Sequence, residues 1–153
     1  MGEKERIVDQ LQRAFDGRAW HGPSVMALLS DVDVDQAAAR PLKERHTIWE
    51  LVLHINDWRD KVRRVLGGEK MESLPKEEGW PTIDDTSDEA WAKAVEELKR
   101  VHDELLEAVS SFSESRLDET VPGASYSFYN MLHGLVQHDL YHAGQIAIMK
   151  RKE

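Results

Sequence analysis

The chain has 153 residues and a formal net charge of −9, from 29 acidic and 20 Lys or Arg residues. Binding to nucleic acids or anionic membranes depends on neutralising phosphates, so this acidic balance argues against both as partners. The chain has no cysteine, which excludes disulfides, thiolate nucleophiles and Cys-ligated zinc.

The first element expected is a helix from Glu3 to Phe15, whose inward residues are Ile7, Leu11, Ala14 and Phe15. A shorter helical piece starts at Gly22-Pro23-Ser24, with Pro23 in its first turn, and continues through Leu29. Asp33 with Gln36 caps one more short turn before Pro41.

The first long helix is predicted from about Ile48 to Leu66. Apolar residues recur there in steps of three and four, the period of bundle packing: Ile48, Leu51, Ile55, Trp58, Val62 and Val65. Thr47 with Glu50 forms a capping box, and Gly67-Gly68 ends the helix.

A long connection from Gly67 to Thr86 follows, containing Pro75, Gly79 and Pro81, and we expect its Trp80 to pack against the bundle. The second long helix is predicted from about Ser87 to Phe112, with Thr86 and Glu89 as its cap. Its inward stripe is Trp91, Ala94, Leu98, Val101, Leu105, Ala108 and Phe112.

Pro122 and Gly123 mark the turn into the last helix, predicted from about Ser127 to Arg151. Lys150-Arg151-Lys152 has the charge that suits a helix C-terminus. The chain contains no strand pattern or repeat, so the sequence predicts an all-α fold: a four-helix bundle with one long crossover connection, formed by residues 1–153 as a single domain.

His138 and His142 are the most informative residues of the last helix, because side chains four apart share one helix face. They lie on its inward stripe, which comprises Phe128, Met131, Leu135, His138, His142, Gln145 and Met149. Buried imidazoles cost free energy unless each ring nitrogen finds a partner. A metal ion bound by both rings would be such a partner for a nitrogen of each ring.

A third ligand must come from another helix, because no histidine follows His142. His54 is the leading candidate, since it flanks the inward stripe of the first long helix, with Glu50 and Asp57 available to orient its ring. The alternative for His54 is a boundary residue bonded to a backbone group or carboxylate.

The other histidines fit local roles better than metal binding. His102 is expected at a solvated edge and His46 beside a cap, while His133 lies too far round its helix to share a metal with His138. His21 follows Trp20, which we expect to pack in the core. Asp139 occupies the glutamate position of the zinc-protease motif His-Glu-x-x-His and is expected to point outward.

At these residues the chain resembles the DinB-like (DinB/YfiT) family of metalloenzymes. The similarity is carried by Arg45-His46-Thr47-Ile48-Trp49-Glu50-Leu51-Val52-Leu53-His54-Ile55, by Leu132-His133-Gly134 and by His138-Asp139-Leu140-Tyr141-His142-Ala143-Gly144-Gln145-Ile146. Trp20-His21-Gly22-Pro23-Ser24 resembles an N-terminal segment of one branch. The resemblance implies a four-helix bundle that binds a divalent metal, often nickel or zinc, through His54, His138 and His142, and it also implies a homodimer.

Characterised relatives include transferases that use the thiols bacillithiol or mycothiol. The resemblance therefore implies a metal-dependent enzyme acting on a small molecule, most plausibly a thiol S-transferase. A metal-dependent hydrolase and a non-catalytic metal-binding protein of the stress response stay open as alternatives. The N-terminus lacks the apolar run of a signal peptide, so we expect the protein to be cytoplasmic.

Overall fold

The computed structural model describes residues 1–71 and 80–150. Its elements are α1 (Glu3–Phe15), α2 (Val25–Leu29), α3 (Val34–Ala38), α4 (Ile48–Leu66), α5 (Asp88–Ser111), the short 3-10 turn η1 (Glu114–Arg116) and α6 (Phe128–Met149). No strand occurs in these residues, which hold only isolated bridges between Ala19 and Gly22 and between Thr120 and Ser127. None of these helices is long and apolar enough to cross a membrane. The predicted all-α class is confirmed.

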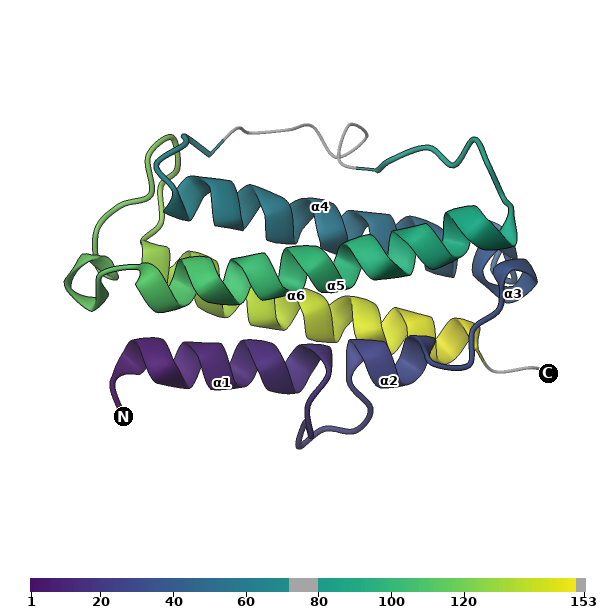
Figure 1. Cartoon of the computed structure of the whole chain (residues 1–153), viewed down its shortest axis with the longest axis horizontal. Coiled ribbons are helices and arrows are strands. Elements are labelled where there is room, and N and C mark those ends of the chain that lie inside the picture. Colours follow the sequence, from purple (N-terminus) through teal and green to yellow (C-terminus); the bar gives the residue numbers. More distant parts are fainter. Residues whose placement is uncertain (72–79, 151–153) are drawn as a thin grey trace.

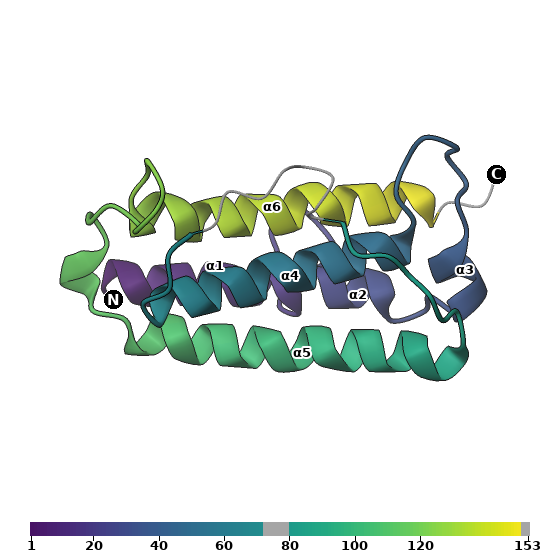
Figure 2. The same cartoon turned by 90° about the horizontal axis from the view of Figure 1, so that it is seen from above.

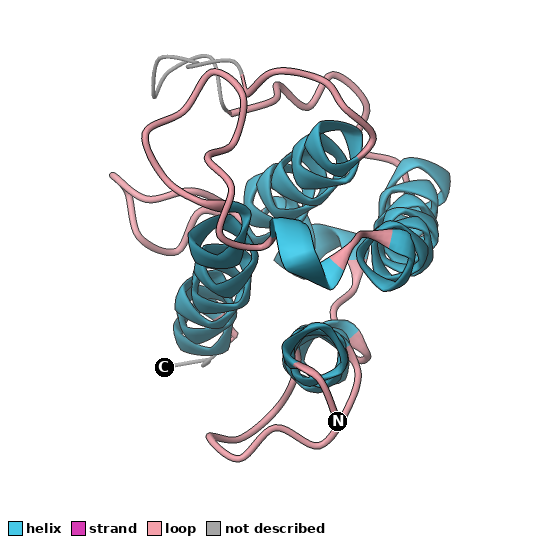
Figure 3. Ribbon diagram, turned by 90° about the vertical axis from the view of Figure 1, so that its left-hand side faces the viewer, coloured by secondary structure: helices cyan, strands magenta, loops and turns pink. Residues whose placement is uncertain are grey.

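The helices α1, α4, α5 and α6 lie side by side as a bundle (Figures 1 and 3). In Figure 2, α4 and α5 run in the same direction, so the connection between them must return along the length of the bundle. The helices α1 and α6 run the opposite way, and α2 extends the row of α1 along α6. This is the expected four-helix bundle with one long crossover. The expectations for Pro75 and Gly79 lie outside the described residues.

Polar caps fix where the helices begin. At α4, Thr47 Oγ1 accepts from the backbone N–H of Glu50 at 3.1 Å and the Glu50 carboxylate accepts from that of Thr47 at 2.8 Å, as predicted. At α2 the cap is Ser24, so Pro23 precedes the helix instead of lying in its first turn. At α5 the expected cap Thr86 is wrong: Ser87 caps the helix by accepting from Ala90 N–H.

The inward stripes form two clusters of buried apolar side chains. One gathers around α2, α3 and the N-terminal half of α4, and includes Trp49, Trp91 and Ile146. The other fills the opposite end of the bundle and includes Leu11, Leu105 and Phe128. Burial of apolar surface is the main stabilising contribution here. Between the two clusters lie buried histidines and charged groups.

The last helix ends two residues before the predicted Arg151, which lies outside the described residues together with Lys152. The Lys150 ammonium donates to the backbone carbonyl of Leu28 at 2.5 Å and pairs with Asp31. These contacts fasten the end of α6 to α2 and to the turn that follows it.

The cap of α5 provides a test with a built-in control. Ser87→Ala should lower the free energy of unfolding by about 1 kcal/mol, because it removes an N-cap acceptor. Thr86→Ala, one residue earlier and exposed, should leave it unchanged. Urea denaturation of both variants measures the difference, and equal losses would contradict the assignment of Ser87 as the cap.

Candidate metal centre

Two helices bring together the three histidines predicted from the sequence. His54 comes from the middle of α4, and His138 and His142 come from successive turns of α6. His138 Nε2 lies 3.0 Å from His54 Nε2 and 3.1 Å from His142 Nε2. The ligand atoms of all three lie within 4.8 Å of one another, an arrangement that can hold a metal ion.

The donor set suits a divalent metal. Nitrogen atoms bound to one ion at about 2.1 Å lie about 3.0–3.4 Å apart for bond angles near 90–110°, and the two short contacts of His138 fall in that range. If His138 Nε2 carries a proton, it can donate a hydrogen bond to only one of its two neighbours, His54 Nε2 or His142 Nε2. A metal cation accepts the lone pairs of all three rings.

Gln145, the next residue on the inward stripe of α6, fixes the orientation of His142. Its side-chain carbonyl accepts from His142 Nδ1 at 2.6 Å, which leaves the lone pair of His142 Nε2 directed toward the other rings. Burial, followed by the neighbouring His142 and His54, lowers the pKa of His138 to about 3. Burial also lowers the pKa of His142. The neutral form required of a metal ligand is therefore favoured.

Aromatic rings enclose the three-histidine group. The Trp80 ring stacks on His54 with centroids 4.0 Å apart, and His46 stacks on the other face of Trp80 at 3.4 Å. The Trp58 ring lies 5.9 Å from that of His138. The expectation that Trp80 packs against the bundle is confirmed. His46, which the sequence linked only to the α4 cap, also holds Trp80 in place.

Glu50 and Asp57 were expected to orient His54. The Glu50 carboxylate is instead engaged by the backbone of Thr47 and by Arg40, at 2.8 and 2.7 Å. Asp57 is exposed on α4. The Trp80 ring, stacked on His54, encloses its face.

A buried charged cluster lies directly behind the histidines. The Arg59 guanidinium, fully buried, donates to Asp139 Oδ2 at 2.6 Å and to His102 Nδ1 at 2.7 Å. It also lies over the ring of Phe15, with 4.5 Å between the guanidinium carbon and the ring centroid. Asp139 and His102 are both buried, so the predictions that Asp139 points outward and that His102 is a solvated edge residue are wrong.

The sequence held a signal for this cluster. Arg59 stands four residues after Ile55, His102 four after Leu98 and Asp139 four after Leu135, so each shares a face with core residues. This spacing predicts buried positions for all three side chains, and buried charges need partners, but the spacing does not say which residues are in contact. Burial raises the pKa of Asp139 to about 6, opposed by Arg59, and lowers the pKa of Arg59 itself.

The remaining histidines lie away from the centre. His133 Nε2 faces Glu3 Oε1 at 3.3 Å, consistent with the prediction that it does not join His138. Trp20 is fully exposed, so the prediction that it packs in the core is wrong, and the adjacent His21 is exposed as well.

An all-α bundle with three convergent imidazoles at its centre defines a class of helical proteins with a candidate metal site. A comparison with protein families matches residues 19–146 to the DinB superfamily. This match covers most of the chain, which therefore belongs to the DinB superfamily. Neither the curated proteins nor the solved structures gave a significant match.

The buried His102 predicts a pH dependence of stability. Burial and the adjacent Arg59 lower the pKa of His102 to about 3 from 6.5. Below pH 6.5 the unfolded chain therefore binds a proton that the folded chain excludes, and stability falls as the pH falls. His102→Asn keeps an acceptor for Arg59 but does not titrate.

The His102 ring stacks on Phe15 with centroids 3.8 Å apart, and we expect His102→Asn to cost about 1–2 kcal/mol at pH 7.5 through loss of this packing. Between pH 7 and pH 5 the variant should lose less stability than the wild type. Denaturant unfolding at both pH values measures this, and parallel losses in the two proteins would contradict a neutral buried His102.

Proposed function

We propose that this protein is a metal-dependent enzyme that transfers a low-molecular-weight thiol to a small electrophile. The observation that carries the proposal is the convergence of His54, His138 and His142 through their Nε2 atoms, with contacts of 3.0 and 3.1 Å. Nickel or zinc is the proposed ion, because imidazole suits both. Three protein ligands leave coordination positions for substrate.

A divalent ion at this site supplies Lewis acidity, which lowers the pKa of a coordinated thiol so that a thiolate is available at neutral pH. The chain's own residues prepare the site for it. Gln145 holds His142 in the tautomer that presents Nε2. Trp80 covers the face of His54 and Trp58 lies beside His138, and both rings limit the access of water.

Two cavities lie near the histidines along the seam between α4 and α6, one lined by His138 and the other by Gln145, the partner of His142. An apolar cavity of about 340 Å³ reaches His138 from the side of Trp58 and Leu135. A second cavity of about 330 Å³, lined in part by Arg45, His46 and Gln145, lies on the other side. The two cavities offer space for two organic substrates, which transfer requires and hydrolysis does not.

In the proposed reaction the thiol sulfur forms a bond to an electrophilic carbon. With an aryl halide as acceptor, the carbon–halogen bond breaks and the halide leaves with its electron pair, while the thiol proton passes to solvent. The overall charge and the electron count are conserved, and no oxidant is needed. The thiol comes from a cosubstrate, since the chain has no cysteine.

The hydrolase alternative needs a base, which would be Asp139 or another carboxylate. Asp139 is fully buried and its Oδ2 accepts from Arg59 at 2.6 Å, so it is held away from any substrate. The hydrolase would therefore need another carboxylate as its base. Asp139 is better explained as a positioning residue for the neighbouring His138.

Metal content provides the first test. Protein purified without an affinity tag and incubated with Ni²⁺ or Zn²⁺ should retain about one ion per chain, because three neutral imidazoles converge. His142→Ala should lose it. His133→Ala, on the same helix but paired with Glu3, should retain it. Elemental analysis after gel filtration measures the content, and a full equivalent of metal in His142→Ala would refute the ligand assignment.

Turnover provides the second test. Metal-loaded protein should consume 1-chloro-2,4-dinitrobenzene only when bacillithiol, mycothiol or glutathione is present, and His54→Ala should reduce the rate by at least about a hundredfold through loss of the ion. Absorbance of the thioether product reports the rate. Consumption of ester substrates without thiol would support the hydrolase, and a metal-loaded protein inactive on every panel would support the non-catalytic alternative.

A further inference from the structure

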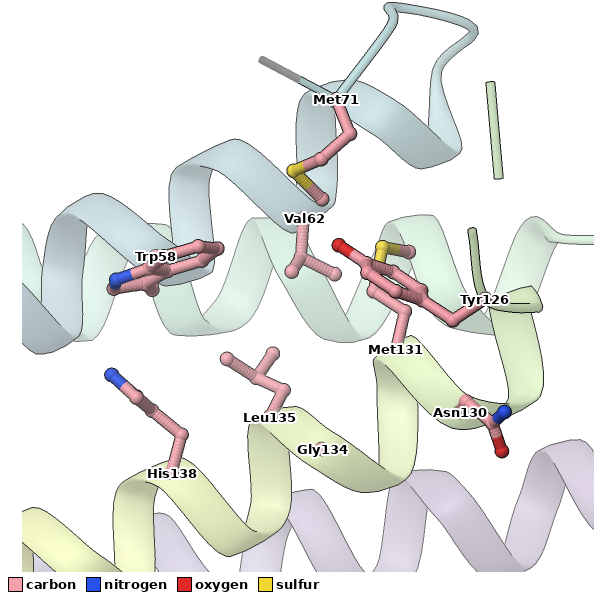
Figure 4. Close-up of a pocket in the computed structure, with 9 residues that line it drawn as sticks. All are labelled: Trp58, Val62, Met71, Tyr126, Asn130, Met131, Gly134, Leu135 and His138. Atoms are coloured by element: carbon pink, nitrogen blue, oxygen red, sulfur yellow. The ribbon is translucent and has the colours of Figure 1, made fainter. Parts of the chain in front are cut away.

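The apolar cavity beside His138 has a composition that selects its occupant. Trp58 and Val62 of α4 form one wall, and Met131 and Leu135 of α6 form the other (Figure 4). None of the described residues that line it carries a formal charge at neutral pH. Its volume of about 340 Å³ lies at the lower end of the range of about 300–1,000 Å³ for small-molecule sites.

The two ends of the cavity differ. His138, one of the three convergent histidines, lies at one end, and the Tyr126 side chain lies toward the other, with its hydroxyl group directed toward Val62 (Figure 4). A molecule in the cavity therefore has its body against apolar side chains and one end beside the candidate metal centre. An ionic group on that body would lose its hydration without finding a partner of opposite charge among the described residues of the lining.

Gly134 keeps this space open. It lies in the middle of α6, where glycine is less favourable than alanine, and it lines the cavity. A Cβ atom at this position would meet no heavy atom within 4 Å. Side chains on a helix lean toward its N-terminus, so a larger residue here would project over Asn130 and Met131, into the cavity.

We propose that this cavity binds the uncharged, apolar carbon skeleton of the electrophilic substrate and presents its reactive end to His138. The proposal rests on the proposed function and adds the substrate class: neutral aromatic or aliphatic electrophiles, with charged ones excluded. Gly134 is the residue that sets the length of skeleton the cavity accepts.

The test uses N-phenyl-1-naphthylamine, a neutral aromatic probe whose fluorescence rises when it leaves water, and the full chain as purified. Wild-type protein should bind one probe per chain. Gly134→Leu should weaken binding by at least about tenfold, equivalent to about 1.4 kcal/mol, because leucine fills the cavity.

Gly144→Leu is the matched control. Gly144 is a second glycine within α6 whose added Cβ would also meet no heavy atom within 4 Å, but it is exposed and does not line the cavity. Its replacement should leave the affinity within about twofold of wild type. Both variants gain helix propensity, so their unfolding midpoints should not fall. Equal affinities in the two variants, or no saturable binding by the wild type, would overturn the proposal.

The 8-sulfonate of the same probe tests the exclusion of charge. At 0.15 M salt it should bind to the Gly134-sensitive site at least about tenfold more weakly than the neutral parent. Equal or tighter binding at that site would overturn the substrate class.

In the turnover assay, Gly134→Leu should raise KM for the aryl halide and leave KM for the thiol unchanged. The metal content of each sample shows separately whether the proposed metal centre stands.

Discussion

The fully buried guanidinium of Arg59 is the interaction on which the rest of the bundle depends. It joins three helices through Asp139 and His102 and lies against Phe15 of a fourth. Removing a cation from water is costly, and only good geometry offsets that cost. A small shift of α6 along α4 would leave the charge of Arg59 unpaired, so the ion pair penalises every other alignment of the two helices.

That alignment also assembles the candidate metal centre. Asp139 and His138 are adjacent on α6, and Arg59 follows His54 by about one and a half turns of α4. The contact that joins Arg59 to Asp139 at 2.6 Å therefore places His54 opposite His138, where their Nε2 atoms lie 3.0 Å apart. The charged cluster thus aligns α4 with α6, and this alignment brings the three histidines together.

The surroundings of the histidines decide what chemistry they support. Trp80 reaches them from the long connection, and its stacking between His46 and His54 closes one side. Along the helix seam lie an apolar cavity lined by His138 and a second cavity of mixed polar and apolar lining that includes Gln145. A glycine on α6 leaves room in the apolar one. This asymmetry is the basis of the proposed reaction between two substrates of different polarity.

The sequence alone determined the helical period, most helix boundaries and the face on which His138 and His142 lie, because these follow from local geometry and from spacing within one helix. It also indicated His54, through its place beside an apolar stripe. It could not decide which polar residues meet across helices. His102 lies 43 residues after Arg59 along the chain, and Asp139 lies 80 residues after it. A charged residue at a core position is predicted to be solvated as long as its partner is unknown. Only the tertiary structure decided that pairing, because the free-energy cost of burying each group is offset only by its contacts with the others.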